Sequence, residues 1–348
     1  MIAVILAGGR GLRLWPESRQ SRPKQLCKFV NNRSMLDHTI DRLSLSGATR
    51  ITIITNDSLY LSVKELVDHR ADADIIDILS EPEGKNTAPA VGLVLSLYHE
   101  KYPDETIGIF PADHHVLNVE AFKDSIRRAC LAAGEGNLVT IGIAPSRPET
   151  GYGYIEKTRF EVGQIPGVYE VNSFYEKPDT KTASDYIASG NHMWNSGIYI
   201  GTTNTLMQEF KEHLPTIYEK MLLGHDGYLK SYSTFPNISL DYGIAEKSKR
   251  IAVVDSDFGW CDLGSWEALA ELHELDENNN ICNGDDIVAI ESKDCIIQQS
   301  EKSIVTFGLE NLLIVETDEV IFIANRDNSQ DFRVIVDILK NKDRQDLL

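Results

Sequence analysis

The sequence has few cysteines, no long apolar run and a shortage of basic residues. Its five cysteines are an odd number and form no Cys-x-x-Cys pair, which argues against a disulfide framework or a zinc ribbon. No stretch approaches the roughly 20 apolar residues that span a bilayer. Lys and Arg number 34 against 53 Asp and Glu, and the resulting net charge of −19 disfavours nucleic acids and membrane surfaces as partners.

The ordinary parts of the composition indicate a globular protein. Hydrophobic residues make up 42% and charged residues 25% of the 348 residues, and this length suggests about two domains. The apolar run at residues 2–7 is too short for a signal-peptide core and lacks a basic lead. Together with the scattered thiols, this predicts a soluble, cytoplasmic protein.

The first three quarters of the chain alternate between two patterns. Short apolar runs that predict buried strands lie at residues 2–7, 51–55, 106–110 and 138–143. Segments with helical spacing of apolar residues lie between and after them, at residues 57–67, 89–98 and 122–131. This alternation predicts an α/β fold, with a Rossmann-like, mostly parallel sheet flanked by helices.

The tail has a different pattern. Short apolar runs recur every eight to ten residues between positions 287 and 323, with turn-forming residues between them and no helical segment among them. This spacing predicts a small β-helix or β-roll. Residues 332–340 then show helical spacing. We therefore expect two domains, residues 1–275 and residues 276–348, the second ending in a helix.

A glycine-rich loop, Gly8-Gly-Arg-Gly11, follows the first predicted strand. It lacks the Gly-Lys-Ser/Thr of a Walker loop, and Leu14 stands where the dinucleotide fingerprint has its third glycine. Seven basic residues and one acidic residue give residues 1–33 a charge of +6, which leaves −25 for the rest; the seven are Arg10, Arg13, Arg19, Arg22, Lys24, Lys28 and Arg33. A basic, glycine-rich turn after a strand predicts a polyphosphate site.

The pattern Gly8-Gly-x-Gly-x-Arg-Leu14, Pro16 and Arg22-Pro-Lys-Gln25 resembles the signature of sugar-1-phosphate nucleotidylyltransferases, and among these the mannose-1-phosphate guanylyltransferases, or GDP-mannose pyrophosphorylases. The resemblance extends over residues 1–345 through six blocks in family order. It implies that Arg13 and Lys24 hold the triphosphate and the leaving pyrophosphate. It also implies a loop around the nucleotide, formed by Leu6, Ala7, Gly8, Gly9 and Gly11. The family usually has an apolar residue in place of Glu17.

Two further blocks concern the base and the metal. Residues 81–90 resemble the block that meets guanine, through Asn86, Thr87 and Ala88, although a plain helix N-cap at Asn86 or Thr87 explains part of the pattern. Asp113 follows a strand at the edge where open α/β sheets bind ligands, so we expect it to bind Mg²⁺ beside the nucleotide. His114 and His115 lack the neighbouring His or Cys residues of a transition-metal site.

The last blocks concern the sugar. By resemblance, Gly153 lets the chain pass near the sugar, Glu176 binds its hydroxyls, Asn195 hydrogen-bonds it and Lys177 aligns its phosphate as a catalytic group. Asp262 is the implied second Mg²⁺ ligand, also near the sugar. Residues 239–247 match the family too, and we interpret them as largely structural.

The resemblance implies transfer of GMP from GTP to α-D-mannose 1-phosphate, giving GDP-mannose and pyrophosphate, by Mg²⁺-assisted in-line attack of the sugar phosphate on the α-phosphorus. It also implies a homodimer. Two alternatives stay open: a guanylyltransferase for another sugar 1-phosphate, and a non-catalytic regulatory subunit that senses nucleotide sugars. The second is disfavoured because Asp113, Asp262 and Lys24 are all present. Mannose 6-phosphate isomerase activity is not expected, since the sequence has no His-rich C-terminal block.

Overall fold

The computed structural model describes residues 1–9, 11–19, 22–31, 33–328 and 332–347. The chain forms two compact units. Unit 1 consists of Met1–Gly8, Asp37–Ala112 and Val116–Trp260, and unit 2 of Gly9–Leu36, Asp113–His115 and Cys261–Leu348. Two short strands, β5 (His115–Val116) and β11 (Trp260–Cys261), each contain a border between the units.

These units differ from the expected division at residue 275. The loop at residues 9–36 and the segment after residue 260 both belong to unit 2. The physical reason is a shared core: Leu14 of the loop is buried with Trp266 and with Leu313 of the C-terminal strands. The division at residue 275 into two domains that fold independently stays a prediction.

Unit 1 is built on a nine-stranded sheet in the order β3-β2-β1-β4-β9-β6-β10-β8-β7. The strands are β1 (Ile2–Leu6), β2 (Arg50–Asn56), β3 (Ile76–Glu81), β4 (Thr106–Pro111), β6 (Leu138–Ile143), β7 (Gly153–Glu161), β8 (Val168–Glu176), β9 (His192–Thr202) and β10 (Ile251–Ser256). Strands β3, β2, β1 and β4 are parallel, as are β6 and β10, which confirms the expected mostly parallel sheet. Strand β9 is antiparallel to β4 and β6, and β8 is antiparallel to β10 and β7.

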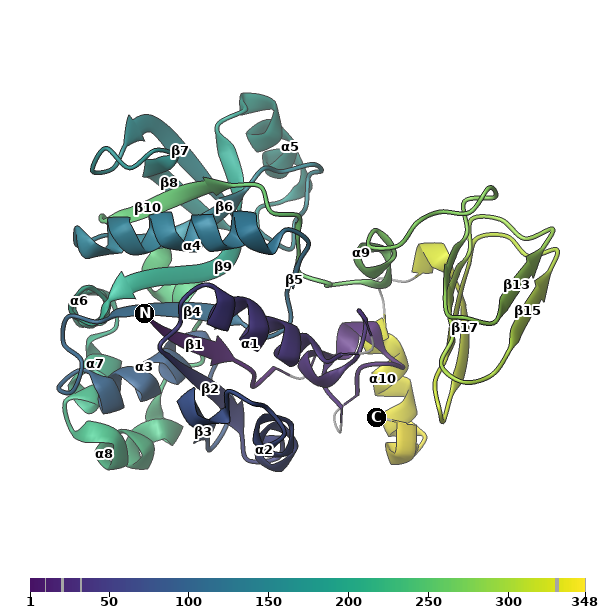
Figure 1. Cartoon of the computed structure of the whole chain (residues 1–348), viewed down its shortest axis with the longest axis horizontal. Helices are drawn as coiled ribbons and strands as arrows, with labels where there is room; N and C mark the ends of the chain where they lie inside the picture. The colour runs from purple at the N-terminus through teal and green to yellow at the C-terminus, as the bar shows by residue number, and fades with distance from the viewer. Residues whose placement is uncertain (10, 20–21, 32, 329–331, 348) are drawn as a thin grey trace. The chain divides into compact units, whose positions relative to one another are not determined.

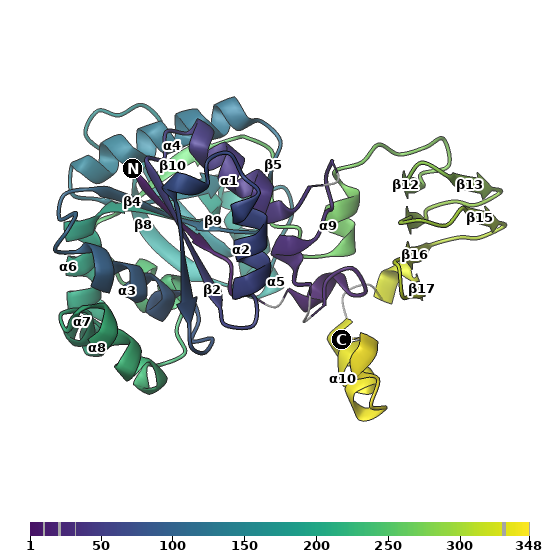
Figure 2. The same cartoon turned by 60° about the horizontal axis from the view of Figure 1, so that its bottom comes forward.

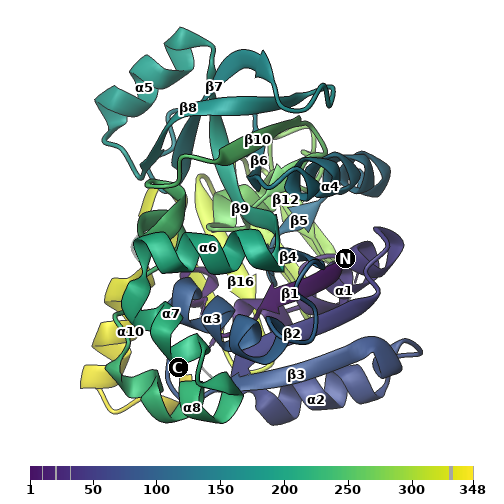
Figure 3. The same cartoon turned by 90° about the vertical axis from the view of Figure 1, so that its left-hand side faces the viewer.

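The helices of unit 1 cover both faces of this sheet (Figures 1 and 3). They are α1 (Met35–Leu45), α2 (Tyr60–Asp68), α3 (Thr87–Tyr98), α4 (Val119–Gly134), α5 (Thr180–Ser189), α6 (Thr203–His213), α7 (Pro215–Met221) and α8 (Gly224–Ser231). Strand β4 shows why both faces are apolar, since successive side chains point to opposite sides. Ile107 and Ile109 join the α3–α6 core, whereas Phe110 contacts Phe122 of α4 with ring centroids 6.4 Å apart.

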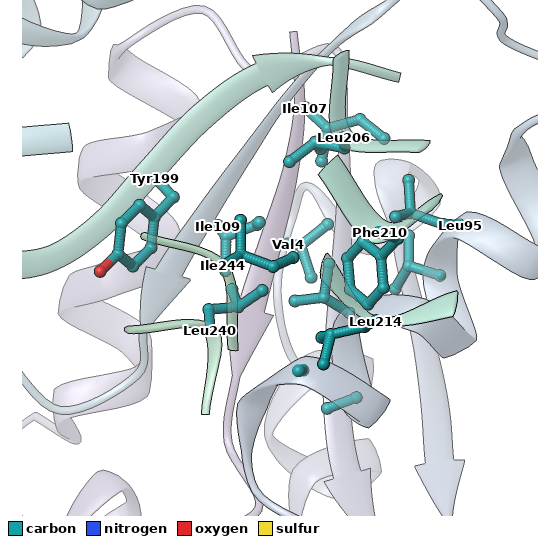
Figure 4. Close-up of a cluster of buried hydrophobic side chains, with 14 of the residues drawn as sticks. Val4, Leu95, Ile107, Ile109, Tyr199, Leu206, Phe210, Leu214, Leu240 and Ile244 are labelled. Atoms are coloured by element: carbon teal, nitrogen blue, oxygen red, sulfur yellow. The ribbon is translucent and has the colours of Figure 1, made fainter. Parts of the chain in front are cut away.

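The core between the sheet and α6 is continuous (Figure 4). Val4 and Ile109 of the strands pack with Phe210 of α6, and all three side chains are fully buried. Tyr199 of β9 lies at the border of this cluster, and its hydroxyl points away from the apolar side chains. The core thus fixes one end of Tyr199 and leaves its polar end for hydrogen bonding.

Unit 2 contains the expected β-helix. Its strands are β12 (Ile281–Asn283), β13 (Ile287–Ile290), β14 (Ile296–Gln298), β15 (Ile304–Phe307), β16 (Leu312–Glu316) and β17 (Ile321–Asn325). Ile281, Ile296 and Leu313 stack in parallel register in one sheet, and β13 pairs with β15 in a second (Figure 2). Stacked parallel strands of successive coils are what the regular spacing of apolar runs predicted.

Further helical segments belong to unit 2. They are the short 3₁₀ turns η1 (Leu12–Leu14) and η2 (Lys24–Leu26), which follow the glycines in the loop at residues 9–36, the helix α9 (Trp266–Ala270) and the C-terminal helix α10 (Phe332–Asn341). Helix α10 matches the helical spacing expected at residues 332–340. Among the described residues, no helix combines the length and apolar character that crossing a membrane requires.

Candidate active site

The predicted site residues fall into both units. Unit 1 contains Leu6, Ala7, Gly8, Asn86, Thr87, Ala88, Gly153, Glu176, Lys177 and Asn195, and unit 2 contains Gly9, Gly11, Arg13, Lys24, Asp113 and Asp262. The residues implied to bind the triphosphate and the metal are therefore mostly in unit 2, and those implied to bind the base and sugar are in unit 1 except Asp262.

In unit 2 the glycine-rich loop folds closely onto Lys24. Gly11 has a φ of +54°, and a Cβ added to it would lie 2.5 Å from the Cβ of Lys24. A larger residue would meet both the backbone strain and this contact. The side-chain amide of Gln25 donates to the carbonyl of Gly9 at 3.0 Å, which ties the two ends of the loop together.

The basic residues of this loop have different environments. Arg19 is buried, ion-paired with Glu319 and bonded to the Thr317 hydroxyl at 3.1 Å, and Arg22 pairs with Glu17 at 3.0 Å. Burial raises the pKa of Glu17, and the Arg22 charge partly offsets this. These residues are structural, whereas Arg13 and Lys24 line a pocket. Arg10 lies outside the described residues.

The pocket of unit 2 has a volume of about 520 Å³. It is lined by Gly11, Arg13, Lys24, Asp113, His114, Asp262, Leu263, Gly264, Val336, Asp337 and Lys340. Arg13, Lys24, Asp113 and Asp262 were singled out from the sequence, where up to 249 positions separate them, and the structure brings all four together. The three residues of α10 were not predicted to belong to a site.

Lys24 is the most enclosed charged residue of the pocket. The residue is only 6% exposed. Its Nζ lies 2.8 Å from Asp113 Oδ2 and donates to the backbone carbonyl of Asp262. Burial raises the pKa of the Asp113 carboxyl, but Lys24 and His114 outweigh this effect and the pKa lies below its ordinary value. Asp113 is therefore an anion that already attracts a cation.

Asp262 is held by the backbone that follows it. The Gly264 amide donates to Asp262 Oδ1 at 2.9 Å, and a Cβ at Gly264 would lie 2.7 Å from Oδ2. Two carboxylates in one pocket, one of them in contact with an ammonium group, are the hard oxygen donors that suit a divalent cation such as Mg²⁺. The residues present thus fit the metal that the family resemblance implies.

In unit 1, the predicted base-binding segment is the start of α3. Asn86 is the N-cap, has a φ of +69° and accepts from the Thr87 amide at 2.9 Å. The Thr87 hydroxyl accepts from the amide of Leu240 at 2.8 Å, and the Ala88 amide donates to the Ile238 carbonyl at 3.1 Å. A hydroxyl that accepts can also donate its proton, whereas the Ala88 amide is already engaged.

The end of β1 approaches a buried carboxylate. The Ala7 amide continues the sheet by donating to the Ile54 carbonyl at 2.7 Å, just beyond Leu6. A Cβ at Gly8 would lie 2.5 Å from Glu81 Oε1, and Glu81 accepts from the Tyr232 hydroxyl at 2.7 Å. Burial raises the pKa of Glu81, with the Tyr232 hydrogen bond opposing. Gly8 therefore leaves room for Glu81 in unit 1.

The predicted sugar-binding residues of unit 1 come together on three neighbouring strands. A Cβ at Gly153 of β7 would lie 2.5 Å from Oε2 of Glu176 and 3.3 Å from Cβ of Asn195. Lys177 follows β8 with a φ of +51° and forms an ion pair with Glu176. Burial and the nearby Asp241 raise the pKa of Glu176, and Lys177 partly offsets them.

Asn195 belongs to a polar network that the sequence did not reveal. Its Oδ1 accepts from Thr140 at 2.8 Å, and its Nδ2 donates to Asp241 at 2.9 Å and to Tyr199 at 3.0 Å. The Tyr199 hydroxyl also donates to Asp241, at 2.6 Å, and its pKa is raised well above the ordinary value by burial and this carboxylate. Asn195 is thus held by three side chains and by the Gly197 amide, which donates to its Oδ1 at 3.2 Å.

Asp241 begins a π-helical turn, Asp241–Ala245, inside the block interpreted from the sequence as largely structural. The same segment carries Glu246, whose carboxylate accepts from the Glu176 amide at 2.9 Å. This turn therefore fixes both Asn195 and Glu176, and short π-helical turns often occur at functional sites. The only signal in the sequence was that the block matched the family.

A second cluster of metal-ligand types lies on α6. The ligand atoms of Glu209, Glu212 and His213 are within 4.8 Å of one another, the only such group of three found among the described residues. Arg250 pairs with Glu209 at 2.8 Å and with Glu212 at 3.0 Å. The cluster is therefore explained as an ion-pair network with a charged partner of its own.

The sequence matches two family models and several curated proteins. The Nucleotidyl transferase model matches residues 2–279, and the MannoseP isomerase/GMP-like beta-helix domain model matches residues 285–339. Mannose-1-phosphate guanylyltransferases of Escherichia coli and Klebsiella pneumoniae are 36% and 37% identical, with 99% of this chain and 77% and 75% of theirs covered. The chain belongs to the mannose-1-phosphate guanylyltransferase family of nucleotidyl transferases.

Other relatives agree with this family. The alginate biosynthesis protein AlgA of Pseudomonas aeruginosa is 37% identical over 99% of this chain and 73% of its own. A crystal structure from Thermus thermophilus, described as a mannose-1-phosphate geranyltransferase, has a TM-score of 0.89 at 31% identity and covers 97% of this chain and 99% of its own. A UDP-glucose pyrophosphorylase complexed with UDP-glucose has 16% identity and a TM-score of 0.53, with 78% and 96% covered, and shares the fold alone.

Proposed function

We propose that this member of the mannose-1-phosphate guanylyltransferase family transfers GMP from GTP to α-D-mannose 1-phosphate and releases pyrophosphate. The observation that carries the proposal is the pocket of unit 2, where two cationic side chains, Arg13 and Lys24, meet two carboxylates, Asp113 and Asp262. Triphosphates bound together with a divalent cation need this combination of charges. The names of the relatives supply the sugar and the base.

We assign separate parts of the substrates to separate sets of residues. Arg13 and Lys24 bind the β- and γ-phosphates, with the glycine-rich loop around the nucleotide. Asn86 and Thr87 recognise the guanine edge, and Glu176 and Asn195 bind sugar hydroxyls. Lys177 orients the sugar phosphate. The amide of Asn195 is held in one orientation by Thr140, Gly197, Tyr199 and Asp241.

Asp113 and Asp262 would hold the Mg²⁺ ion, which neutralises phosphate charge when it is bound. The nucleophile is an oxygen of the sugar phosphate, which is already anionic, so no side chain has to remove a proton. The bond from this oxygen to the α-phosphorus forms as the bond from the α-phosphorus to the bridging oxygen of pyrophosphate breaks. The side chains position the two substrates and stabilise the charge on the leaving group. A homodimer and a cytoplasmic location are proposed on the family resemblance alone.

The test is a matrix of substrates. The purified full chain is incubated with Mg²⁺, each of the four ribonucleoside triphosphates and either mannose 1-phosphate or glucose 1-phosphate, and pyrophosphate is measured. We expect release with GTP and mannose 1-phosphate. Release of pyrophosphate with a different pair would identify different substrates. No release with any pair would favour the regulatory subunit.

Substitution of Gly153 tests the assignment of the sugar. In Gly153→Ala the new methyl group would meet Glu176 Oε2, so the carboxylate has to move. We expect the KM for mannose 1-phosphate to rise about tenfold with the KM for GTP unchanged, because small displacements of positioning groups have large kinetic effects. Gly134→Ala is the control, since a Cβ there meets nothing within 4 Å. Equal KM values in both variants would place Glu176 away from the sugar.

A further inference from the structure

Helix α10 forms part of the wall of the unit 2 pocket. Val336, Asp337 and Lys340 line it together with Arg13 and Lys24. Residues 336 and 337 are each spaced from residue 340, by four and three positions, so that they lie next to it on the helix surface. Helix α10 lies more than 300 residues after Arg13 and Lys24 in the sequence. It therefore supplies a third cationic side chain to the pocket that we assign to the triphosphate.

The position of α10 in unit 2 is fixed by the glycine-rich loop. Val336 is 2% exposed and packs in one cluster with Trp15, which directly follows η1. The indole Nε1 of Trp15 donates to the carbonyl of Leu347 at 2.8 Å, and its ring meets Phe322 edge-on with centroids 5.1 Å apart. The phosphate-binding loop and the end of the chain thus hold each other in place.

The charges of the pocket leave Lys340 available for an anion. Lys24 is engaged by Asp113 at 2.8 Å and by the Asp262 carbonyl. Among the described residues, Lys340 has one ion pair, a long contact of 3.5 Å between its Nζ and Asp337 Oδ1. The two side chains are 44% and 71% exposed. Exposed pairs of this kind contribute little, so a phosphate could readily take the place of Asp337.

We propose that Lys340 binds the pyrophosphate part of the triphosphate substrate and of the released product. The inference rests on the proposed function and adds a residue that the glycine-rich signature does not contain. A flexible ammonium group suits the terminal phosphates, which carry the most charge and need no planar, bidentate partner. Helix α10 is then part of the binding site for the leaving group.

The alternative is that Lys340 serves only α10 itself. A lysine in the last turn of a helix is favoured by the helix dipole wherever that helix lies. Lys342 provides the matched control, because it is exposed, lies two residues further along, donates its amide to the Ile338 carbonyl at 3.1 Å and does not line the pocket. Lys340→Gln and Lys342→Gln remove the same charge from the same end of the chain.

The experiment is calorimetric titration of inorganic pyrophosphate, with Mg²⁺, into the full chain and its variants. We expect Lys340→Gln to weaken binding about tenfold, the effect of losing one charge-assisted contact, with Lys342→Gln and Lys340→Arg close to wild type. Asp337→Asn should bind pyrophosphate more tightly than wild type, because it removes a competing carboxylate. In the forward reaction, Lys340→Gln should raise the KM for GTP and leave the KM for mannose 1-phosphate unchanged.

Two results would overturn the inference: wild-type affinity in Lys340→Gln, or equal losses in Lys340→Gln and Lys342→Gln. The second would show that only the overall charge matters. Thermal unfolding of each variant shows whether a loss of pyrophosphate binding comes from misfolding. If Lys340→Gln misfolds, the tighter binding expected in Asp337→Asn tests the proposal instead. If wild type makes GDP-mannose but Lys340→Gln is normal, only this inference fails. If wild type neither binds pyrophosphate nor makes a nucleotide sugar, the proposed function fails with it.

Discussion

Asp113→Asn and Asp262→Asn are each expected to reduce kcat about 10²–10³-fold, as is typical when one electrostatic contact to a transition state is lost. Both carboxylates line the pocket of unit 2, and asparagine keeps the shape of the side chain while removing its charge. Steady-state kinetics over a range of Mg²⁺ concentrations measures the effect. The concentration of Mg²⁺ at half-maximal rate should rise in both variants.

In the absence of metal, the two variants should differ in thermal stability. Asp113→Asn removes the charged partner of Lys24, whereas Lys24 donates to the backbone carbonyl of Asp262, which the substitution keeps. Asp343→Asn is the control, an exposed carboxylate of unit 2 outside the pocket, with a φ of +55° that asparagine also tolerates. Wild-type turnover in both pocket variants would remove Asp113 and Asp262 from the metal site.

The local patterns of the sequence predicted most of the fold. Apolar runs bounded by glycine or turn residues gave β1, β2, β4 and β6, and helical spacing gave α3, α4 and α10, each within a few residues. Such patterns arise because one face of a helix or strand is buried, so they can be recognised without knowing which element packs against that face. The antiparallel insertion of β9 between β4 and β6 could not be predicted, because strand order is set by contacts distant in sequence.

The site shows the same limit. Asp113 and Gly11 could be found because each follows a strand, where chain geometry alone brings ligands close. The role of Asp241 could not be predicted even though its block matched the family, since it acts through a hydrogen bond to Asn195, 46 positions earlier. Lys340 is a similar case. Its place in the pocket depends on the packing of Val336 with Trp15, which a helical pattern does not specify.

Lys24→Gln is expected to reduce kcat/KM for GTP about 100-fold, because a cation that neutralises the leaving phosphates is lost. Glutamine keeps a hydrogen-bond donor on the side chain and removes the charge. Lys28→Gln is the control, four residues along the same loop, exposed and outside the pocket. Equal rates in wild type and Lys24→Gln would make Lys24 a structural residue only.

The ion pair with Asp113 adds a consequence for stability. Substitution of Lys24 should also lower the thermal stability slightly, because the residue is only 6% exposed and its Nζ lies 2.8 Å from Asp113 Oδ2. Removing one member of an enclosed pair leaves the other charge without compensation. Asp113→Asn should therefore lower Tm less in the Lys24→Gln background than in wild type. Thermal unfolding of the four proteins of this double-mutant cycle, without nucleotide or metal, measures the coupling, and strictly additive shifts would show that the pair does not stabilise the fold.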